Sequence, residues 1–459
     1  MSEPDSLVPP PVEGVARPYR RWGAAFGGRF FLLFAIGLIW LVPVLVEPRF
    51  AYAMLAWDGL VGLAWAVDLA QLAKPSQLKI KRSWRDPTAL SVSSEIDITL
   101  TNQSSVTVHA LIVDSIPQSL RFAPAQVEIS APAHGDRATS FAICPLKRGE
   151  AKLGDAYVRY QSPMRIAERW VKVPLGQRVQ VYPNLDEAKR QSVYLIRSRQ
   201  IELEKRHSRM RGIGREFESL REYREGDEYR DICWTAAARR GKLVTRVYQV
   251  ERSQTIWIVI DSGRLMRARI GDLSKLDYAA NAALSLAQVA LYSGDRVGLM
   301  TYGRAVRQRV PADRGGLHLR QLMESLADVQ EETSEADHLQ AAGRLLTDQK
   351  RRSLVVWLTD LAETAMTPEV IDAASRMMPR HLVLFVVIGQ PDLGELAAEE
   401  PKDEEQMFQI AAAQEVIHRR ELLLARLRER GALALEVSSG SLSPALVNSY
   451  LEVKQRNRL

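Results

Sequence analysis

The chain has 459 residues, a length that indicates two to four domains. Charged residues make up 25% and hydrophobic residues 46%, which excludes a wholly disordered or collagen-like chain. The 62 Lys and Arg exceed the 55 Asp and Glu by seven, so the location of that small excess matters more than its size. Two cysteines are too few for a disulfide framework or a four-thiolate zinc site.

The N-terminal region divides into a polar segment and two apolar runs. Residues 1–28 are rich in proline and poor in apolar side chains, which predicts a flexible N-terminal tail. The uncharged run 30–46 and the apolar run 50–72 are each close to the length that a helix needs to cross about 30 Å of hydrocarbon. Only Glu47-Pro48-Arg49 separates them. The sequence therefore predicts a transmembrane helical hairpin over residues 29–74.

The flanks of this hairpin are basic. Lys and Arg precede the first run and follow the second, at Arg17, Arg20, Arg21, Arg29, Lys74, Lys79, Lys81, Arg82 and Arg85. Only Arg49 lies in the connection between the runs. By the positive-inside rule, this distribution predicts cytoplasmic flanks. We expect a two-pass protein of the cell (inner) membrane, with its N-terminus and its soluble domains in the cytoplasm.

Two carboxylates fall within the second apolar run. An intramembrane carboxylate such as Asp58 is a candidate functional residue by default. The alternative, which we favour, is that Asp58 lies near the interface and is protonated or hydrogen-bonded to the partner helix, because no basic residue accompanies it. Asp68 is close enough to the cytoplasmic end of the run for us to expect it to be solvated.

A β-rich region follows the hairpin. Residues 75–183 contain short segments of alternating apolar and polar residues, such as 96–100 and 179–182, separated by Pro, Gly, Asn and Ser clusters. Several short strands at a spacing of about ten residues predict a small β-sandwich. The region shows no convergent His, Cys or carboxylate cluster, so we expect a structural or docking role.

A basic connector spans residues 184–250. Within it, residues 189–246 hold 16 Lys and Arg against nine Asp and Glu, a net charge equal to that of the whole chain. The interleaved acids favour a structural or partner-binding segment, while anionic lipid and nucleic acid remain alternative ligands. Gly212-Ile213-Gly214 is not followed by the Gly-Lys-Ser/Thr of a phosphate-binding loop.

The last region, residues 251–459, alternates apolar strands with helices. Five strands are predicted, at 255–260, 296–302, 354–358, 382–388 and 432–437. Crossover helices between them predict an α/β doubly wound parallel sheet, whose ligands bind at the carboxyl ends of the strands. The acidic stretch 392–405 is expected to be a solvated loop.

Two carboxylates follow predicted strands directly. Asp261 and Asp360 come at the ends of the first and third strands, where a hard cation such as Mg²⁺ finds the oxygen ligands it prefers. Alternatively, each carboxylate caps the turn or helix that follows it. The spacing alone leaves both interpretations open.

The order of residues from Gly212 to Asp261 resembles the signature of a bacterial family called domain of unknown function 58. The residues that carry the resemblance, and that it implies face a partner, are Gly212, Gly214, Glu216, Phe217, Arg221, Tyr223, Gly226, Asp227, Asp231 and Trp234. The resemblance covers roughly residues 30–390 and implies two spans, a β-domain and a von Willebrand factor A-like domain. Because such proteins are often encoded beside MoxR-type AAA+ ATPases, it also implies an adaptor or chaperone-like role with such a partner.

A von Willebrand factor A domain implies a metal site built on Asp-x-Ser-x-Ser, a distant Thr and a second Asp. Asp261 matches the first Asp and Asp360 the second. Gly263 and Leu265 occupy the two Ser positions, and the Thr position near Asp337 has no hydroxyl. We therefore expect no cofactor, with Mg²⁺ as the alternative.

These observations predict a membrane-anchored cytoplasmic adaptor protein rather than an enzyme. The protein partner implied by the resemblance is a MoxR-type AAA+ ATPase. A metal-dependent hydrolase that uses the strand-end carboxylates is the alternative from another class. Binding of anionic lipid through the basic connector is a further alternative, and nucleic acid is not an expected partner.

Overall fold

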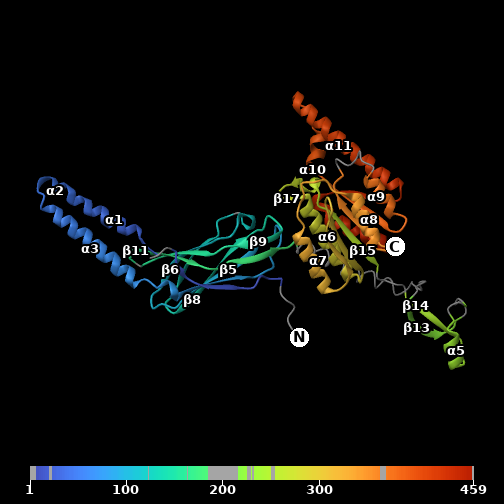
Figure 1. Cartoon of the computed structure of the whole chain (residues 1–459), viewed down its shortest axis with the longest axis horizontal. Helices are drawn as coiled ribbons and strands as arrows, with labels where there is room; N and C mark the ends of the chain where they lie inside the picture. Colours follow the sequence, from blue (N-terminus) through green and yellow to red (C-terminus); the bar gives the residue numbers. More distant parts are fainter. Residues whose placement is uncertain are drawn as a thin grey trace. The chain divides into compact units, whose positions relative to one another are not determined.

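The computed structural model describes most of the chain. The described residues are 7–19, 23–121, 123–162, 164–184, 216–224, 229, 232–249, 254–361 and 369–456. They form two compact units, Met1–Asn184 and Leu185–Leu459, each of which is described by itself (Figure 1).

The N-terminal segment contributes three short strands to the first unit, namely β1 (Val12–Val15), β2 (Arg17–Pro18) and β3 (Ala24–Phe26). The first pairs with β4 (Leu78–Trp84), and the other two pair with β11 (Ala167–Val173), all antiparallel.

The expected flexible tail is therefore wrong for residues 12–18 and 24–26, which pair in the two sheets. The two sheets of the β-rich domain offer strand edges, and the N-terminal segment satisfies the edge hydrogen bonds. Gly14 permits this close approach, since a Cβ there would lie 2.5 Å from the carbonyl oxygen of Pro174.

Two apolar helical segments follow. The first comprises α1 (Gly28–Gly37) and α2 (Leu41–Val46), joined by one 3₁₀ turn, and the second is α3 (Phe50–Gln71). By length and composition, both segments are able to cross a membrane. Only 6% of the most apolar part of each is buried within the protein, unlike a core helix, which packs against its own chain.

The two helical segments contact each other closely at Gly37. A Cβ at this position would lie 2.8 Å from both the carboxylate of Asp58 and the indole of Trp57. The indole nitrogen of Trp57 also donates to the carbonyl oxygen of Leu33, at 3.0 Å. Asp58 thus lies against the partner helix.

Asp68 anchors the end of α3 to the β-domain. Its carboxylate accepts hydrogen bonds from the hydroxyl of Ser162 at 2.5 Å and the backbone N–H of Ala167 at 2.9 Å. The expectation that Asp68 is solvated is wrong, because the residue is only 4% exposed. Packing of the β-domain against the helix end excludes water there.

The β-rich domain has two larger antiparallel sheets around one core. One has the strand order β1-β4-β5-β8, and the other β2-β11-β10-β6-β7. Both contribute alternate apolar side chains to a single hydrophobic core, as in a β-sandwich. The remaining strands are β5 (Ser94–Asn102), β6 (Val108–Asp114), β7 (Gln126–Ala131), β8 (Gly135–Ile143), β9 (Gly149–Leu153), β10 (Ala156–Gln161) and β12 (Gln177–Val181).

The connector forms a small hairpin module where it is described. Strands β13 (Glu216–Glu222) and β14 (Val244–Gln249) pair antiparallel, and α5 (Trp234–Arg240) lies between them in sequence. The side chains of Ile232 and Val244 are buried.

A six-stranded mixed sheet lies in the second unit. Its strands are β15 (Thr255–Asp261), β18 (Arg296–Tyr302), β19 (Val306–Asp313), β20 (Leu354–Thr359), β21 (Leu382–Gly389) and β22 (Leu433–Ser438). Their spatial order is β19-β18-β15-β20-β21-β22. Five of these strands are parallel, as predicted. The expectation of a wholly parallel sheet is wrong, because β19 forms an antiparallel edge.

Helices cover both faces of the mixed sheet (Figure 1). One face packs against α6 (Lys275–Tyr292), α7 (Gly316–Asp328) and α12 (Leu442–Gln455). The other packs against α8 (His338–Asp348), α9 (Glu369–Met377) and α11 (Glu404–Glu429).

The acidic stretch 392–405 is not the loop that its composition suggests. It contains most of α10 (Pro391–Ala398) and the start of α11. Pro391 is the first residue of α10, a position that favours proline because its missing N–H would be unpaired there. Asp403 caps α11 by accepting from the backbone N–H of Gln406, at 2.7 Å.

Candidate functional site

The strand order reverses direction between β15 and β20. Counted from β15, the order of the six strands is 3-2-1-4-5-6, so the first and fourth strands are neighbours and their crossovers run to opposite sides. Asp261 is the last residue of β15, and Asp360 directly follows β20. The predicted pair therefore lies at the switch point of the sheet, where crossover connections leave a crevice.

The carboxyl group of Asp261 is buried and held by two hydrogen bonds. The hydroxyl of Thr359 donates to one oxygen at 2.7 Å, and the backbone N–H of Gly263 donates to the other at 2.7 Å. Burial raises the pKa of Asp261 from 3.8 to about 6, although both hydrogen bonds oppose the shift. The nearby charge of Asp360 raises it further.

The carboxylate of Asp360 accepts from two cationic side chains. The ammonium of Lys275 lies 2.5 Å from one oxygen, and the guanidinium of Arg420 lies 3.3 Å from the other. Arg420 also donates to Glu436, at 2.7 Å. Lys275, Asp360 and Arg420 are at most 3% exposed. These four side chains form a charge-balanced network at the strand ends.

This donor set does not fit a tightly bound divalent cation. Asp360 already directs both oxygens at positive groups, and an ammonium has no lone pair with which to ligate a metal. Asp337 caps α8 by accepting from the backbone N–H of Gln340, at 2.8 Å. Across the described part of the chain, no three His, Cys, Asp or Glu residues are grouped as metal ligands would be.

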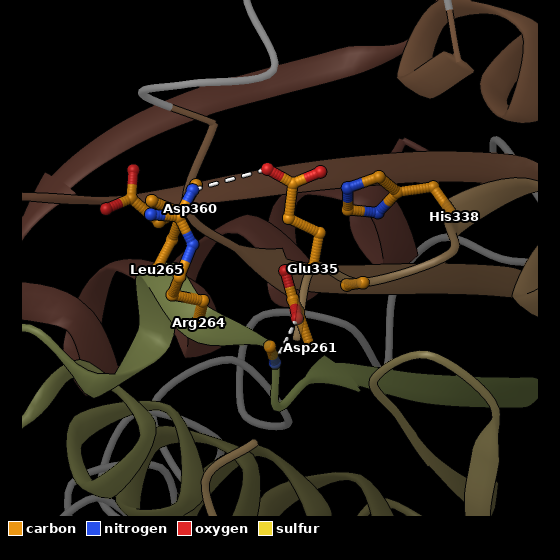
Figure 2. Close-up of a pocket in the computed structure, with 8 residues that line it drawn as sticks. Asp261, Arg264, Leu265, Glu335, His338 and Asp360 are labelled. Carbon is orange, nitrogen blue, oxygen red and sulfur yellow. Dashed lines mark hydrogen bonds and ion pairs between the residues drawn. The ribbon is translucent and has the colours of Figure 1, made fainter. Parts of the chain in front are cut away.

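A pocket opens at these strand ends, beside Asp261 and Asp360 (Figure 2). Its other lining residues are Gly263, Arg264, Leu265, Glu335, Ala336 and His338. We call this set the carboxyl edge. Arg264 pairs with Glu335 at 3.2 Å, and both side chains are substantially exposed. The cavity volume is about 20 Å³, far below the range of about 300–1,000 Å³ typical of small-molecule sites.

A buried aromatic network lies behind the pocket. The indole of Trp357 donates to the hydroxyl of Tyr302 at 2.5 Å, and that hydroxyl lies 2.8 Å from Nδ1 of His338. The hydroxyl of Tyr302 thus bridges the indole of Trp357 and the imidazole of His338. Burial lowers the pKa of His338 from 6.5 to about 4, which keeps the ring neutral near pH 7.

The residues predicted from the family motif are described only in part. Gly212, Gly214, Gly226, Asp227 and Asp231 lie outside the described residues. Of the others, Glu216, Phe217 and Arg221 are in β13, while Tyr223 follows that strand.

Aromatic side chains are exposed on the hairpin module. The side chain of Trp234, at the start of α5, is 65% exposed, and Tyr229 is 77% exposed. The rings of Tyr223 and Tyr229 stack with their centroids 6.3 Å apart. Lys242 pairs with Glu222 at 3.0 Å, one instance of the expected pairing between interleaved charges.

Sequence reasoning identified Asp261 and Asp360 but missed Lys275 and Arg420. The sequence did contain one indication that Lys275 has a negatively charged partner. Lys275 is the first residue of α6, where a positive charge opposes the helix dipole unless an anion lies nearby.

Part of this chain is similar to one family model and to relatives whose names assign no activity. Uncharacterized proteins of Mycobacterium bovis and Mycobacterium tuberculosis are 25% identical over 201 residues, which is 41% of this chain and 61% of the relatives' own length.

Among solved structures, the conserved hypothetical protein BatB from Bacteroides thetaiotaomicron matches 44% of this chain and 100% of its own, with 15% identity and a TM-score of 0.32. Proximal thread matrix protein 1 from the mussel byssus matches 43% and 46%, with 12% identity and a TM-score of 0.28. At these scores, neither likeness bears on fold or function. The family model described as "Protein of unknown function DUF58" matches residues 219–424 of this chain.

Proposed function

We propose that this chain is a membrane-anchored protein that binds a protein partner through the carboxyl edge of its α/β sheet. The observation that carries the proposal is the pocket at the switch point, which combines a charged rim with a space smaller than a typical small-molecule site. A protein surface that covers this charged rim suits such a site better than a small molecule that must enter it.

The same proposal assigns the second unit to the von Willebrand factor A-like folds. Its support is the strand order β19-β18-β15-β20-β21-β22 with a single antiparallel edge and helices on both faces. The match of the DUF58 model to residues 219–424, which include most of this sheet, is compatible with the family resemblance on which the assignment rests.

The partner class that the resemblance implies is a MoxR-type AAA+ ATPase. In this proposal the chain is an adaptor without enzymatic activity of its own, and it serves complex assembly or a chaperone-like process. The exposed Trp234 and Tyr229 of the hairpin module give a second surface that suits a protein partner, since exposed aromatic residues are enriched at interfaces.

Membrane anchoring rests on the apolar and mostly exposed helices α1, α2 and α3. Residues before α1 and after α3 pair within the same β-sheets, so both ends of the hairpin lie on one side of any membrane it spans. The basic flanks support a cytoplasmic location for that side. Arg82 does not count among the free flanking charges, because it is buried and paired with Asp114.

A membrane-impermeant thiol reagent tests this topology in intact cells, in a chain whose two native thiols are removed by Cys144→Ser and Cys233→Ser. Single cysteines are then introduced at Glu47 and, as the cytoplasmic control, at Glu95. Both positions lie in exposed parts of the first unit. We expect labelling at Glu47 in intact cells and labelling at Glu95 only after lysis. Labelling of Glu95 in intact cells contradicts the cytoplasmic assignment.

The metal-dependent hydrolase is the weaker alternative. Its mechanism needs a cation to generate the nucleophile, and Asp360 is engaged by Lys275 and Arg420 instead. The basic charges that would bind lipid or nucleic acid lie largely in residues 185–215, outside the described residues.

Co-purification from a detergent extract tests partner binding. We expect an AAA+ ATPase to co-purify with the full-length protein and to be lost from Glu335→Arg, which reverses a charge on the rim. Glu324→Arg is the matched control, because Glu324 also pairs with an arginine on the surface, at 3.0 Å, but lies on α7 away from the pocket. Equal recovery of the ATPase by both variants contradicts the proposed surface.

A further inference from the structure

The side chain of Lys275 is almost completely buried, with only 1% of the residue exposed. Lysine is rarely buried to this extent unless an opposite charge accompanies it, because removing an ammonium from water costs several kcal/mol. At Lys275 the compensating group is Asp360, whose carboxylate oxygen lies 2.5 Å from the ammonium nitrogen. This pair lies at the carboxyl ends of the parallel strands, where a bound ligand or cation would lie.

The ammonium occupies the place where a cation is expected in this architecture. Asp360 follows β20, and Asp261 ends the neighbouring strand β15, so both carboxyl groups face the switch point. Helix α6 begins there with a capping box formed by Ser274 and Asp277, which fixes the first turn and with it the Cα of Lys275.

The charges in this group balance without a metal. Lys275 and Arg420 carry two positive charges, which the carboxylates of Asp360 and Glu436 neutralise. A divalent cation at Asp360 would displace the ammonium or lie beside it and be repelled. Neither Gly263 nor Leu265 offers a side-chain oxygen to compensate for that repulsion.

We propose that Lys275 is a built-in cation that takes the place of a divalent metal ion at the carboxyl edge. The α/β domain thereby keeps Asp360 neutralised whatever the metal supply. This inference concerns the occupant of the site and does not rest on the identity of a partner.

The inference predicts that removal of the ammonium creates a metal site. In Lys275→Ala, Asp360 loses one of its two cations, and the pocket that Asp360 lines also carries a second carboxyl group, Asp261. Two carboxylates and water suit Mn²⁺ or Mg²⁺, which accept a few protein oxygens and retain several waters. The variant is therefore expected to lose stability and to regain it when either ion is added.

A matched control is available in the same domain. Lys454 also pairs with a buried aspartate, Asp295, at 2.6 Å, but this pair lies at the amino end of β18. The partners of Asp295 are Tyr450, Lys454 and the backbone N–H of Gln254. Lys454→Ala is thus expected to lose stability without gaining a metal site.

The experiment measures thermal unfolding of the full-length protein in detergent, with EDTA or with millimolar Mn²⁺, together with Mn²⁺ binding by electron paramagnetic resonance. The wild-type Tm should be the same in both buffers, and wild-type protein should bind no Mn²⁺ that depends on Asp360. Lys275→Ala should show a lower Tm that Mn²⁺ raises, and should bind Mn²⁺ at least roughly tenfold more tightly than wild type. Adding Asp360→Asn should abolish that gain.

Two results overturn the proposal. One is stoichiometric Mn²⁺ binding by the wild-type protein that Asp360→Asn removes, since the native site would then hold a metal. The other is a Lys275→Ala variant that folds but gains no more Mn²⁺ binding than Lys454→Ala. If Lys275→Ala does not fold, Lys275→Met replaces it. If that variant also fails to fold, the wild-type titration decides alone.

Discussion

Asp261 is a carboxyl group whose environment favours its protonated form. Because the pKa is raised from 3.8 to about 6, the folded protein binds this proton more tightly than the unfolded chain does. Stability contributed by the protonated group is therefore present at low pH and is lost as pH rises from about 4 through about 6. At 1.36 kcal/mol per pKa unit, the loss is about 3 kcal/mol at most.

Asp261→Asn should remove this part of the pH dependence. Asparagine cannot ionise, and its oxygen still accepts from the N–H of Gly263. We expect amide hydrogen exchange in β15 and β20, corrected for intrinsic rates, to speed up between pH 4 and pH 7 in the wild type but not in the variant. The same pH dependence in both proteins contradicts the assignment of this proton to Asp261.

Arg82 and Asp114 form a buried ion pair in the β-domain. Arg82 is fully buried, and its guanidinium also donates to the carbonyl oxygen of Leu175 at 2.8 Å. Asp114→Ala leaves this charge uncompensated and should cost about 3–5 kcal/mol of unfolding free energy. Chemical denaturation monitored by fluorescence measures the change.

An exposed group of charges beside the end of β4 is the control for Asp114→Ala. Arg85 bonds Glu95 and Asp97, but its side chain is 54% exposed. Arg85→Ala should cost far less than Asp114→Ala, because exposed ion pairs contribute little. Similar losses for Asp114→Ala and Arg85→Ala would show that burial of the Arg82 pair has no energetic consequence.

At the scale of secondary-structure elements, the helical hairpin depends on one close contact. A methyl group at Gly37 would overlap the side chains of Trp57 and Asp58, so Gly37→Ala should separate the helices at a cost of about 1–3 kcal/mol. Thermal unfolding in detergent micelles measures the loss.

Gly59 and Gly62 of α3 provide controls, because a Cβ at either position meets no atom within 4 Å. Alanine at these sites should leave the hairpin unchanged or stabilise it, since alanine favours helix more than glycine does. A hairpin that tolerates Gly37→Ala as well as Gly59→Ala would disprove the contact.

The elements that sequence predicts well are those whose signal is local. The five parallel strands are continuous apolar runs, and each observed strand begins and ends within two residues of its predicted range. Strand β19 has no such signal, because it lies at a sheet edge and alternates charged residues with half-buried ones. Strands β1, β2 and β3 form only because β4 and β11 offer them an edge, which is tertiary information.

The candidate site can likewise be predicted only where its residues follow a local sequence signal. Asp261 and Asp360 follow apolar strands, so their position at the carboxyl ends can be inferred from sequence. The cations that pair with Asp360 cannot be inferred in this way, since Lys275 and Arg420 lie 85 and 60 residues away from Asp360 in the chain. Only the packing of α6 and α11 against the sheet brings these charges together.

The whole molecule combines an apolar hairpin, a β-domain and an α/β domain, and we propose that the α/β domain presents its carboxyl edge to a protein partner. The opposite end of the sheet serves as a comparison, since α7 follows the antiparallel strand β19 and so begins at the amino ends of the parallel strands.

Site-specific photo-crosslinking in living cells tests this claim most directly. A photoreactive residue would be placed at Arg264, on the rim of the pocket, and at Arg320 of α7 as the control, both with partly exposed side chains. The account predicts an adduct with an AAA+ ATPase from Arg264 and none from Arg320. Adducts of equal yield from both positions, or an adduct from Arg320 alone, would contradict it.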